Sequence, residues 1–313
     1  MKLIDVHRQF NTDDKCLDYL EAMRWPSGVA CIACGSLKVS RITRETKSKN
    51  KRTRIYQCLE PECKHQFSPT AGTIFHDSHL SLQKWFMAIA LICEAKKGVS
   101  ACQMQRHLGV NYRTAWHLCH RIRKAMTQDN LILDAEAVEA DETYVGSKVR
   151  RPRHARPKTK EDDIVLGMVE RGGGRLKLVP VPDTKAGILQ PLLEKHISEK
   201  VGRIFSDEHP IYIFALKNKF PGKHETISHR HAYGIGDVHT NTIENAFSLF
   251  KRGLYGTFHQ VSKKHLARYC DEFSYRFNRR GEQSQLFAET TKALLDGKAL
   301  TYDKLTASEV SES

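Results

Sequence analysis

Hydrophobic periodicity divides the chain into regions of different character. Apolar residues recur at helical spacing in residues 1–24, after a helix cap at Asp13 or Asp14, and again in residues 80–130. Between these regions, residues 25–75 are rich in Cys, Gly, Lys and Thr and contain only short β-like pieces. The pattern predicts an N-terminal helical segment, a small β-containing domain and a helical domain, in that order.

Residues 134–280 alternate between strand-like and helix-like patterns. Two of the apolar runs are joined by three consecutive glycines, which predicts a hairpin. We expect strands at 137–141, 164–169, 176–181 and 203–207 and helices at 186–201 and 242–254. This order predicts an α/β fold with a mixed sheet flanked by helices. We expect residues 281–313 to form a C-terminal helix and a polar, disordered tail beginning near residue 300.

The charge balance favours a polyanionic partner. The chain has 50 Lys and Arg against 36 Asp and Glu, a formal net charge of +14. Each phosphate that a basic side chain neutralises releases counterions, so we expect a nucleic acid as the partner. Two basic runs are candidate phosphate contacts: residues 41–54, and residues 148–160 with Arg150 and Arg151.

Membrane insertion and secretion are not expected. The longest apolar run, 85–93, is about half of what a bilayer requires. Residues 1–10 lack the apolar core of a signal peptide, and nine cysteines without an export signal favour a reducing compartment. The expected location is the cytoplasm.

Four cysteines have the spacing of a zinc site. Cys31 and Cys34 form one pair, Cys58 and Cys63 form the other, and 23 residues separate the pairs. Two turns that each present two thiolates make a tetrahedral site suited to structural Zn²⁺. The four-residue spacer of the second pair leaves His65 open as a substitute ligand. A redox role for the first pair is the alternative, but it would require a helix after Cys34, where the sequence looks extended.

Residues 100–126 have the pattern of a helix-turn-helix. Ser100 can cap a short helix at 101–108 that stops at Gly109, and Asn111 can cap a longer helix at 112–126. The longer helix has an apolar stripe of Ala115, Cys119, Ile122 and Met126, and its other positions carry Arg113, His117, His120, Arg121, Arg123 and Lys124. We expect these basic positions to face outward, with Arg113 and Arg121 as candidate DNA contacts.

Three acids are placed as a metal-dependent phosphoryl-transfer site requires. Asp141 and Asp207 each end an expected strand, and Glu244 begins an expected helix. Neighbouring strands would bring the two aspartates to one end of the sheet, where carboxylates can hold two divalent metal ions. Lys251 lies two helical turns after Glu244 and is a candidate contact to a DNA phosphate.

The strand-end acids are ambiguous by spacing alone. Asp141 is followed by Glu142, and Asp207 is followed by Glu208. Adjacent residues of a strand point to opposite faces, so one acid of each pair should enter the site.

These residues resemble the DDE transposases of bacterial insertion sequences, and more narrowly the IS1595 group, whose members carry an N-terminal zinc ribbon. The resemblance rests on the segments 141–146, 206–207, 239–244, 251–253 and 256–280 and extends in order over residues 25–280. It implies a ribonuclease-H-like catalytic domain at 134–280, Mg²⁺ (or Mn²⁺) as cofactor, and DNA transposition by a cut-and-paste or copying route. Carried over to this chain, Asp141, Asp207 and Glu244 are the metal-binding acids and Lys251 is the basic residue after the third acid.

Two further readings remain open. The chain could be a DNA-binding regulator with an inactive core, or a nuclease of the same fold that cuts without joining. Because a transposase must bring two DNA ends together, the transposase interpretation also predicts a homo-oligomer.

Overall fold

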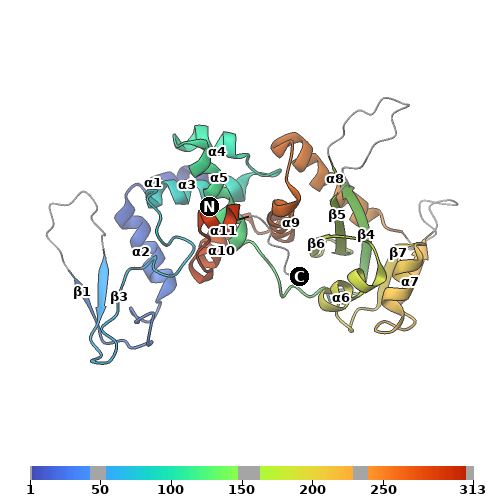
Figure 1. Cartoon of the computed structure of the whole chain (residues 1–313), viewed down its shortest axis with the longest axis horizontal. Helices are drawn as coiled ribbons and strands as arrows, with labels where there is room; N and C mark the ends of the chain where they lie inside the picture. Colours follow the sequence, from blue (N-terminus) through green and yellow to red (C-terminus); the bar gives the residue numbers. More distant parts are fainter. Residues whose placement is uncertain (1, 43–53, 147–162, 228–238, 308–313) are drawn as a thin grey trace. The chain divides into compact units, whose positions relative to one another are not determined.

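The computed structural model describes residues 2–42, 54–146, 163–227 and 239–307 (Figure 1). The chain folds as two compact units. The ribbon unit comprises Met1–Ala125 and Gly281–Ser313, and the sheet unit comprises Met126–Arg280. The C-terminal segment therefore belongs to the same unit as the N-terminus. No helix within the described ranges combines the length and the apolar character needed to cross a membrane.

The ribbon unit contains a bundle of helices with an aromatic core. Its helices are α1 (Leu3–Gln9), α2 (Asp13–Arg24), α3 (Leu82–Glu94), α4 (Ala101–Leu108), α5 (Tyr112–Ala125), α10 (Gln283–Asp296) and α11 (Tyr302–Thr306). Helix α10 packs against α2, α3 and α5. The ring of Phe86 lies 4.7 Å from that of Phe10 and 5.7 Å from that of Phe287, which joins the two ends of the chain in one core.

The expectation of disorder from residue 300 is wrong for the segment up to Thr306. Tyr302–Thr306 is helical, and the side chains of Leu300 and Leu305 are buried. The carbonyl of Leu300 also lies 3.0 Å from the Nε2 atom of His117 in α5. The two buried leucines, together with ring contacts of Tyr302 to Trp116 and His117, dock this segment on the bundle.

The rest of the ribbon unit is a small antiparallel sheet. Its strands are β1 (Val39–Ile42), β2 (Ile55–Cys58) and β3 (Gln66–Phe67), in that order. Tyr56 of β2 donates a hydrogen bond to Glu21 of α2 at 2.7 Å, and Arg54 lies 2.5 Å from Asp18 of the same helix. These contacts attach the small sheet to α2.

The sheet unit is a five-stranded mixed sheet with the order β6-β5-β4-β7-β8. Strand β4 pairs antiparallel with β5 and parallel with β7, β6 pairs antiparallel with β5, and β8 pairs parallel with β7. The strands are β4 (Ala137–Val145), β5 (Asp163–Glu170), β6 (Leu176–Val181), β7 (Arg203–Asp207) and β8 (His224–Ile227). The predicted α/β fold with a mixed sheet is confirmed.

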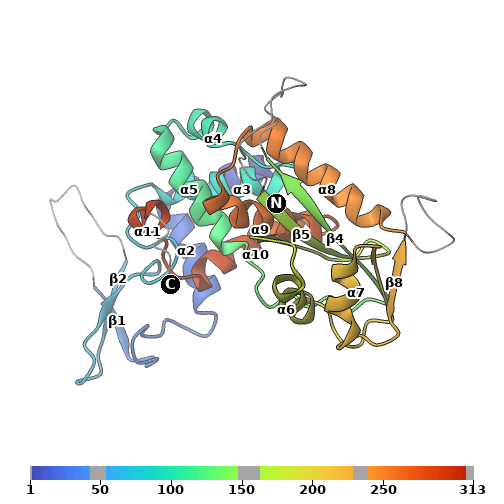
Figure 2. The same cartoon turned by 45° about the vertical axis from the view of Figure 1, so that its right-hand side comes forward.

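Helices cover both faces of this sheet. They are α6 (Ala186–His196), α7 (Pro210–Lys217), α8 (Asn241–Gly253), which continues into a π-helical turn at Leu254–Phe258, and α9 (Lys263–Asn278). In the view of Figure 2, α8 runs above the sheet while α6 and α7 lie below it. Val138 and Ala140 of β4 pack with α6 and α7 in one core, and Val145 packs with α8 and α9 in the other. Alternate residues of β4 thus face opposite helical layers.

The structure changes two predicted boundaries in the sheet unit. Strand β4 does not end at Asp141 but continues to Val145, because the whole segment pairs with β5. The helix predicted at 186–201 ends at His196, because Ile197 turns extended and forms a β-bridge with Leu133. Ile197 and Val201, which completed the apolar pattern, are buried in the same core without being helical.

Candidate active site and metal centre

The two aspartates lie on neighbouring parallel strands. Strand β4 pairs with β7 such that Glu139 is opposite Phe205. Continuing this register by two residues places Asp141 beside Asp207, with both side chains on the face that α8 covers. Asp207 ends its strand as predicted, whereas Asp141 lies in the middle of β4.

The third acid enters from α8. Ile243 and Phe247, on either side of Glu244, pack against Gly167 of β5, and Gly167 is the antiparallel partner of Asp141. A Cβ atom at Gly167 would lie 2.6 Å from the Phe247 ring and 2.8 Å from Ile243 Cδ1. The absence of a side chain at Gly167 therefore allows α8 to approach the sheet at the level of Asp141.

The electrostatics of Asp141 reflect this arrangement. Burial raises the pKa of Asp141 to about 8, and the negative charges of Glu142, Asp207 and Glu244 contribute in the same direction. The backbone N–H of Glu142 donates to Asp141 Oδ1 at 2.8 Å and opposes the shift only in part. Carboxylates gathered around a buried aspartate are a donor set that suits a divalent cation with oxygen ligands.

The structure separates the acids that spacing left ambiguous. Glu142 points to the opposite face of β4 from Asp141, where the Tyr212 hydroxyl of α7 donates to its Oε2 atom at 2.6 Å. Glu208 lies beyond the end of β7 and is exposed. Asp141 and Asp207 therefore share a face with α8, and their glutamate neighbours do not.

Lys251, the basic residue of the predicted site, is in the same helix as Glu244. Lys251 is half-buried in the last turn of α8, and Glu244 is exposed in its first turn. The Thr240 hydroxyl lies 3.4 Å from Glu244 Oε1, and the N–H of Glu244 donates to the Thr240 carbonyl at 3.1 Å. Ala246 and Phe247, which follow Glu244 in α8, are buried in the core beneath the helix.

The helix pair at 101–125 matches its sequence signals, with one correction. Ser100 and Asn111 cap α4 and α5 as predicted, and Gly109 adopts the left-handed conformation at φ 58°. The prediction that Arg121 faces outward is wrong, and His120 and Arg123 are buried with it. The Arg121 guanidinium donates to the carbonyls of Ile74 and His76 and lies 4.9 Å from the centre of the Trp85 ring.

The remaining candidate DNA contacts divide into two groups. Arg113 is exposed near the start of α5, and its guanidinium lies 4.1 Å from the centre of the Tyr302 ring. Arg150 and Arg151 fall outside the described residues, as does most of the basic run 41–54.

The four cysteines converge on one point. Their Sγ atoms all lie within 4.8 Å of one another, with Cys31 and Cys63 at 3.7 Å and Cys34 and Cys58 at 3.6 Å. Tetrahedral zinc with Zn–S bonds of about 2.3 Å places its sulfurs about 3.8 Å apart, so the spacing fits this ion. Among the described residues, these four cysteines are the group whose ligand atoms lie this close together.

The alternatives to a four-cysteine site do not fit the geometry. His65 is exposed and stacks on Phe67, with ring centres 6.2 Å apart, and it is not in the cysteine group. The chain after Cys34 passes a turn into strand β1 rather than into a helix. Burial raises the pKa of Cys31, but hydrogen bonds from the backbone of Cys34 and Ala33 outweigh it and bring the pKa to about 7, whereas burial raises the pKa of Cys58 to about 12. The assignment of zinc therefore rests on the convergence of the four sulfurs.

Sequence reasoning missed two residues that shape the acid site. Gly167 lies across from Asp141 on β5, and Glu139 precedes Asp141 by two residues on β4. Neither residue was a candidate. Alternation in β4 could have indicated Glu139, because residues 139 and 141 face the same side of a strand. Nothing in the sequence indicates which strand pairs with β4 and hence that Gly167 is opposite Asp141.

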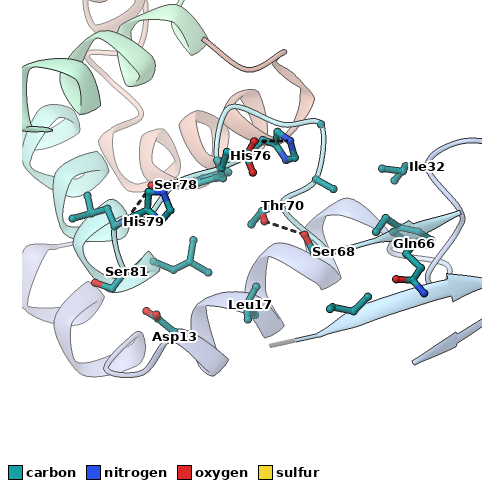
Figure 3. A pocket seen from close by; sticks show the side chains of 18 of the residues that line it. Asp13, Leu17, Ile32, Gln66, Ser68, Thr70, His76, Ser78, His79 and Ser81 are labelled. Carbon is teal, nitrogen blue, oxygen red and sulfur yellow. Dashed lines mark hydrogen bonds and ion pairs between the residues drawn. The ribbon is translucent and has the colours of Figure 1, made fainter. Parts of the chain in front are cut away.

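The ribbon unit also contains a pocket, lined by none of the four cysteines, the acids or the arginines but by His65. It lies where β2 and β3 meet α2 and the start of α3, and Figure 3 shows His76, Ser78 and His79 on its wall. His76 Nε2 lies 3.3 Å from Asp77 Oδ2, and the Trp85 indole donates to Ser78 Oγ at 2.8 Å. These contacts hold the loop between the small sheet and α3.

Comparisons with known proteins agree with the two metal-site regions. Residues 133–278 match the ISXO2-like transposase domain, and residues 11–66 match the transposase zinc-ribbon domain. A protein of the transposable element ISH50 of Halobacterium salinarum, itself described as uncharacterized, is 24% identical over 283 residues. That alignment covers 86% of this chain and 92% of the relative.

Two solved structures of the Mos1 transposase show a weak likeness. A pre-cleavage Mos1 transpososome is 14% identical, with 64% of this chain and 75% of that chain covered and a TM-score of 0.22. The mariner Mos1 paired end complex with Mg is also 14% identical, with 72% and 82% covered and a TM-score of 0.24.

The matched zinc ribbon contains the converging cysteines, and the matched transposase domain contains the sheet, the two strand acids and α8. The chain therefore belongs to the insertion-sequence transposases of the IS1595 group, which combine a transposase zinc ribbon with an ISXO2-like transposase domain.

Proposed function

We propose that this chain binds the ends of an insertion sequence and carries out DNA cleavage and strand transfer with Asp141, Asp207 and Glu244 as its acids. The observation that carries the proposal is the placement of Asp141 and Asp207 on the neighbouring parallel strands β4 and β7, on the face that α8 with Glu244 covers. The three acids come from two strands and a helix that are far apart in the sequence. Their convergence on one face of the sheet is what a phosphoryl-transfer site requires.

We further propose that the sheet unit has a ribonuclease-H-like fold. The order β6-β5-β4-β7-β8, with β5 antiparallel to the other central strands, supports this assignment. In this arrangement the first and fourth strands of the unit are parallel neighbours. That adjacency is the feature that brings the two aspartates together.

The acids would hold Mg²⁺ or Mn²⁺, and Asp141, Asp207 and Glu244 are the residues that supply the oxygen ligands. A bound divalent ion activates the attacking hydroxyl and stabilises charge on the leaving oxygen. The chain's own contribution is to bring three carboxylates to one face of the sheet and to hold Glu244 on a helix. Lys251 in the last turn of the same helix supplies a positive charge for a DNA phosphate.

The ribbon unit would provide the DNA-binding surface. Four cysteines that hold Zn²⁺ stiffen the small sheet, and α4 and α5 form the proposed helix-turn-helix. The exposed face of this pair includes Arg106 and Arg113. Arg113 lies near the start of α5, the part of a recognition helix that reaches base edges. We propose double-stranded DNA as the partner and a homo-oligomer as the form that joins two ends.

The test compares two neighbouring substitutions, Asp207→Asn and Glu208→Gln, in the zinc-loaded full chain. The substrate is DNA that carries the inverted repeats flanking the gene, with Mg²⁺ or Mn²⁺ present. We expect Asp207→Asn to bind this DNA but to lose cleavage and strand transfer by at least about 10³-fold, because one metal ligand is gone. Glu208→Gln removes an equivalent charge outside the site and should retain activity.

The other outcomes identify the competing functions. Strand transfer by Asp207→Asn at the wild-type rate would refute the acid assignment. A wild-type protein that binds the ends but never cuts them would be a regulator with an inactive core. Cutting of any DNA, without joining and without preference for the repeats, would identify a nuclease.

A further inference from the structure

A buried carboxylate lies directly beneath the acid site. Glu139 is on β4, two residues before Asp141 and on the same face, and it is fully buried. Its Oε1 atom accepts hydrogen bonds from Arg171 Nε at 2.7 Å and from the Thr242 hydroxyl at 2.9 Å, and the backbone N–H of Ile243 donates to Oε2 at 2.9 Å. His239 Nδ1 lies 3.2 Å from Oε1. Both oxygens of Glu139 are thus occupied by the protein itself.

The groups that bind Glu139 come from two separate parts of the sheet unit. Thr242 and Ile243 belong to the first turn of α8, whose N–H groups have no partner within the helix. A carboxylate at this position satisfies an N–H group and complements the positive end of the helix dipole. Arg171 follows the end of β5, and its own N–H donates to the Ala137 carbonyl at 3.0 Å.

Arg171 makes further contacts that connect Glu139 and the start of α8 to strand β7. Its guanidinium donates to the His239 carbonyl, just before α8, and lies 3.6 Å from the centre of the Phe205 ring. Phe205 is fully buried in β7, two residues before Asp207, and is the direct strand partner of Glu139. One ion pair therefore connects β4, β5, β7 and the start of α8.

This layer is in register with the layer of acids above it. Glu139 precedes Asp141 by two residues, Phe205 precedes Asp207 by two, and Ile243 immediately precedes Glu244. We propose that Glu139 and Arg171 are positioning residues that fix the first turn of α8, and with it Glu244, relative to Asp141 and Asp207. This inference rests on the proposed function of the three acids.

The physical reason for such a device is the repulsion among the acids themselves. Asp141, Asp207 and Glu244 are carboxylates on one face of the sheet, and like charges repel one another, so without a cation the electrostatics oppose the approach of Glu244. The hydrogen bonds to Thr242 and Ile243 act on the residues just before Glu244 and hold the helix against that repulsion. Metal ligands held in this way typically lose 10–100-fold in affinity, as a rough guide, when the supporting group is removed.

The experiment measures Mn²⁺ binding to the zinc-loaded full chain by electron paramagnetic resonance, with Glu139→Gln as the main variant. The amide keeps the size of the side chain but removes the charge that Arg171 and the helix terminus face. We expect the Kd for Mn²⁺ to rise by at least about tenfold. Cleavage by Glu139→Gln should recover toward the wild-type rate as Mn²⁺ is raised, since the three acids are still present.

The matched control is Glu170→Gln. Glu170 is also buried and also paired with an arginine, Arg175 at 2.6 Å, but it lies opposite Val138 and so on the other face of the sheet. A loss of stability alone would therefore affect both variants. We expect Glu170→Gln to lower the midpoint of unfolding while leaving the Kd for Mn²⁺ unchanged.

A milder variant covers the case in which Glu139→Gln does not fold. Thr242→Val removes a single hydrogen bond to Glu139 from the partly buried first turn of α8, and a smaller increase of the Kd for Mn²⁺ is expected. Wild-type Mn²⁺ affinity in both Glu139→Gln and Thr242→Val would overturn the inference, and so would an equal loss in Glu170→Gln.

Failure of the inference and failure of the proposed function give different results. If Asp207→Asn is inactive while Glu139→Gln binds Mn²⁺ normally, the acids stand and the positioning role is refuted. If Asp207→Asn itself binds Mn²⁺ and cleaves normally, the proposed role of the three acids is refuted.

Discussion

Asp141 and Gly167 are direct partners across the antiparallel strands β4 and β5. Because Gly167 has no side chain, there is room for Ile243 and Phe247 of α8. These two residues precede and follow Glu244 in the helix. The distance between the helix and the sheet at this point therefore depends on a residue with no side chain. This relationship links an acid on a strand to an acid on a helix through packing alone.

Replacement of Gly167 by alanine should disturb the site without touching an acid. The new Cβ atom would meet the Phe247 ring at 2.6 Å, so α8 must shift outward. We expect unfolding by urea to show a loss of about 1–3 kcal/mol from overpacking and cleavage to fall by at least about tenfold, because small displacements in an active site are costly. Gly187→Ala is the control, since nothing lies within 4 Å of its added Cβ atom. Full activity in Gly167→Ala would show that α8 need not pack this closely.

Zinc content should depend on the four cysteines and not on His65. Cys58→Ser removes one of four ligands, and we expect the bound zinc, measured by mass spectrometry of the purified chain, to fall from about one ion per chain to nearly none. His65→Ala should retain the wild-type amount, because His65 stacks on Phe67 outside the cysteine group. Loss of zinc in His65→Ala would restore histidine as a ligand.

The ion pair of Glu170 should make a pH-dependent contribution to stability. Burial raises the pKa of Glu170, but hydrogen bonds from the Arg175 side chain and from the backbone of Arg175 and Asp134 outweigh it, so the pKa lies below its usual range. A lowered carboxyl pKa stabilises the folded state above the unfolded-state pKa, and this stability is lost as the pH falls through the folded-state pKa. At pH 7 we expect Glu170→Gln to be less stable than wild type by about 1–3 kcal/mol.

The difference between the two proteins should shrink as the pH falls below about 4.3, the ordinary pKa of Glu, and should disappear below the lower folded-state pKa of Glu170. Circular dichroism during urea titration at several pH values measures this difference. The zinc ribbon is common to both proteins, so its acid sensitivity cancels. A difference that persists unchanged at low pH would mean that Glu170 contributes through packing rather than through charge.

Arg113 and Arg121 should respond differently to substitution, although both are basic residues of α5. Arg113→Ala removes an exposed charge at the start of α5, so we expect weaker binding to the element ends and a reduced preference for them over other DNA. The lost contact with the Tyr302 ring should cost at most about 1 kcal/mol of stability. Arg121→Ala leaves the carbonyls of Ile74 and His76 without a donor, so we expect a loss of about 2–4 kcal/mol in the free energy of unfolding. Gel shifts at several salt concentrations and urea unfolding separate the two. A specific loss of DNA affinity in a stable Arg121→Ala protein would contradict its structural role.

Local features of the chain were predictable because local chemistry produces them. The two cysteine pairs predicted a tetrahedral thiolate site, and Ser100, Gly109 and Asn111 predicted the ends of α4 and α5. Each of these depends on a few consecutive residues, whose hydrogen bonds or ligand geometry do not require knowledge of the rest of the fold. The same holds for the apolar stripe of α5, which is buried as its helical period predicted.

Arg121 shows why burial was harder to predict. A basic residue beside an apolar stripe is usually exposed, but here the loop at 73–76 covers it and supplies carbonyl acceptors. That loop is separated from α5 by α3 and α4 in the sequence. A charged side chain can be buried wherever backbone groups distant in the sequence provide hydrogen-bond partners. The sequence of a single helix therefore does not predict such burial.

By itself, the sequence determined which kinds of chemistry the chain carries: thiolates at zinc spacing, acids at the ends of apolar segments, and basic runs suited to DNA. Only the tertiary structure decided that Asp141 and Asp207, and not Glu142 and Glu208, share a face with α8. It also decided that Gly167 lies opposite Asp141 and that the C-terminal helix α10 completes the N-terminal bundle. The physical reason is that strand pairing and helix packing join residues far apart in the chain, and a shift of one residue in register would turn every side chain to the other face.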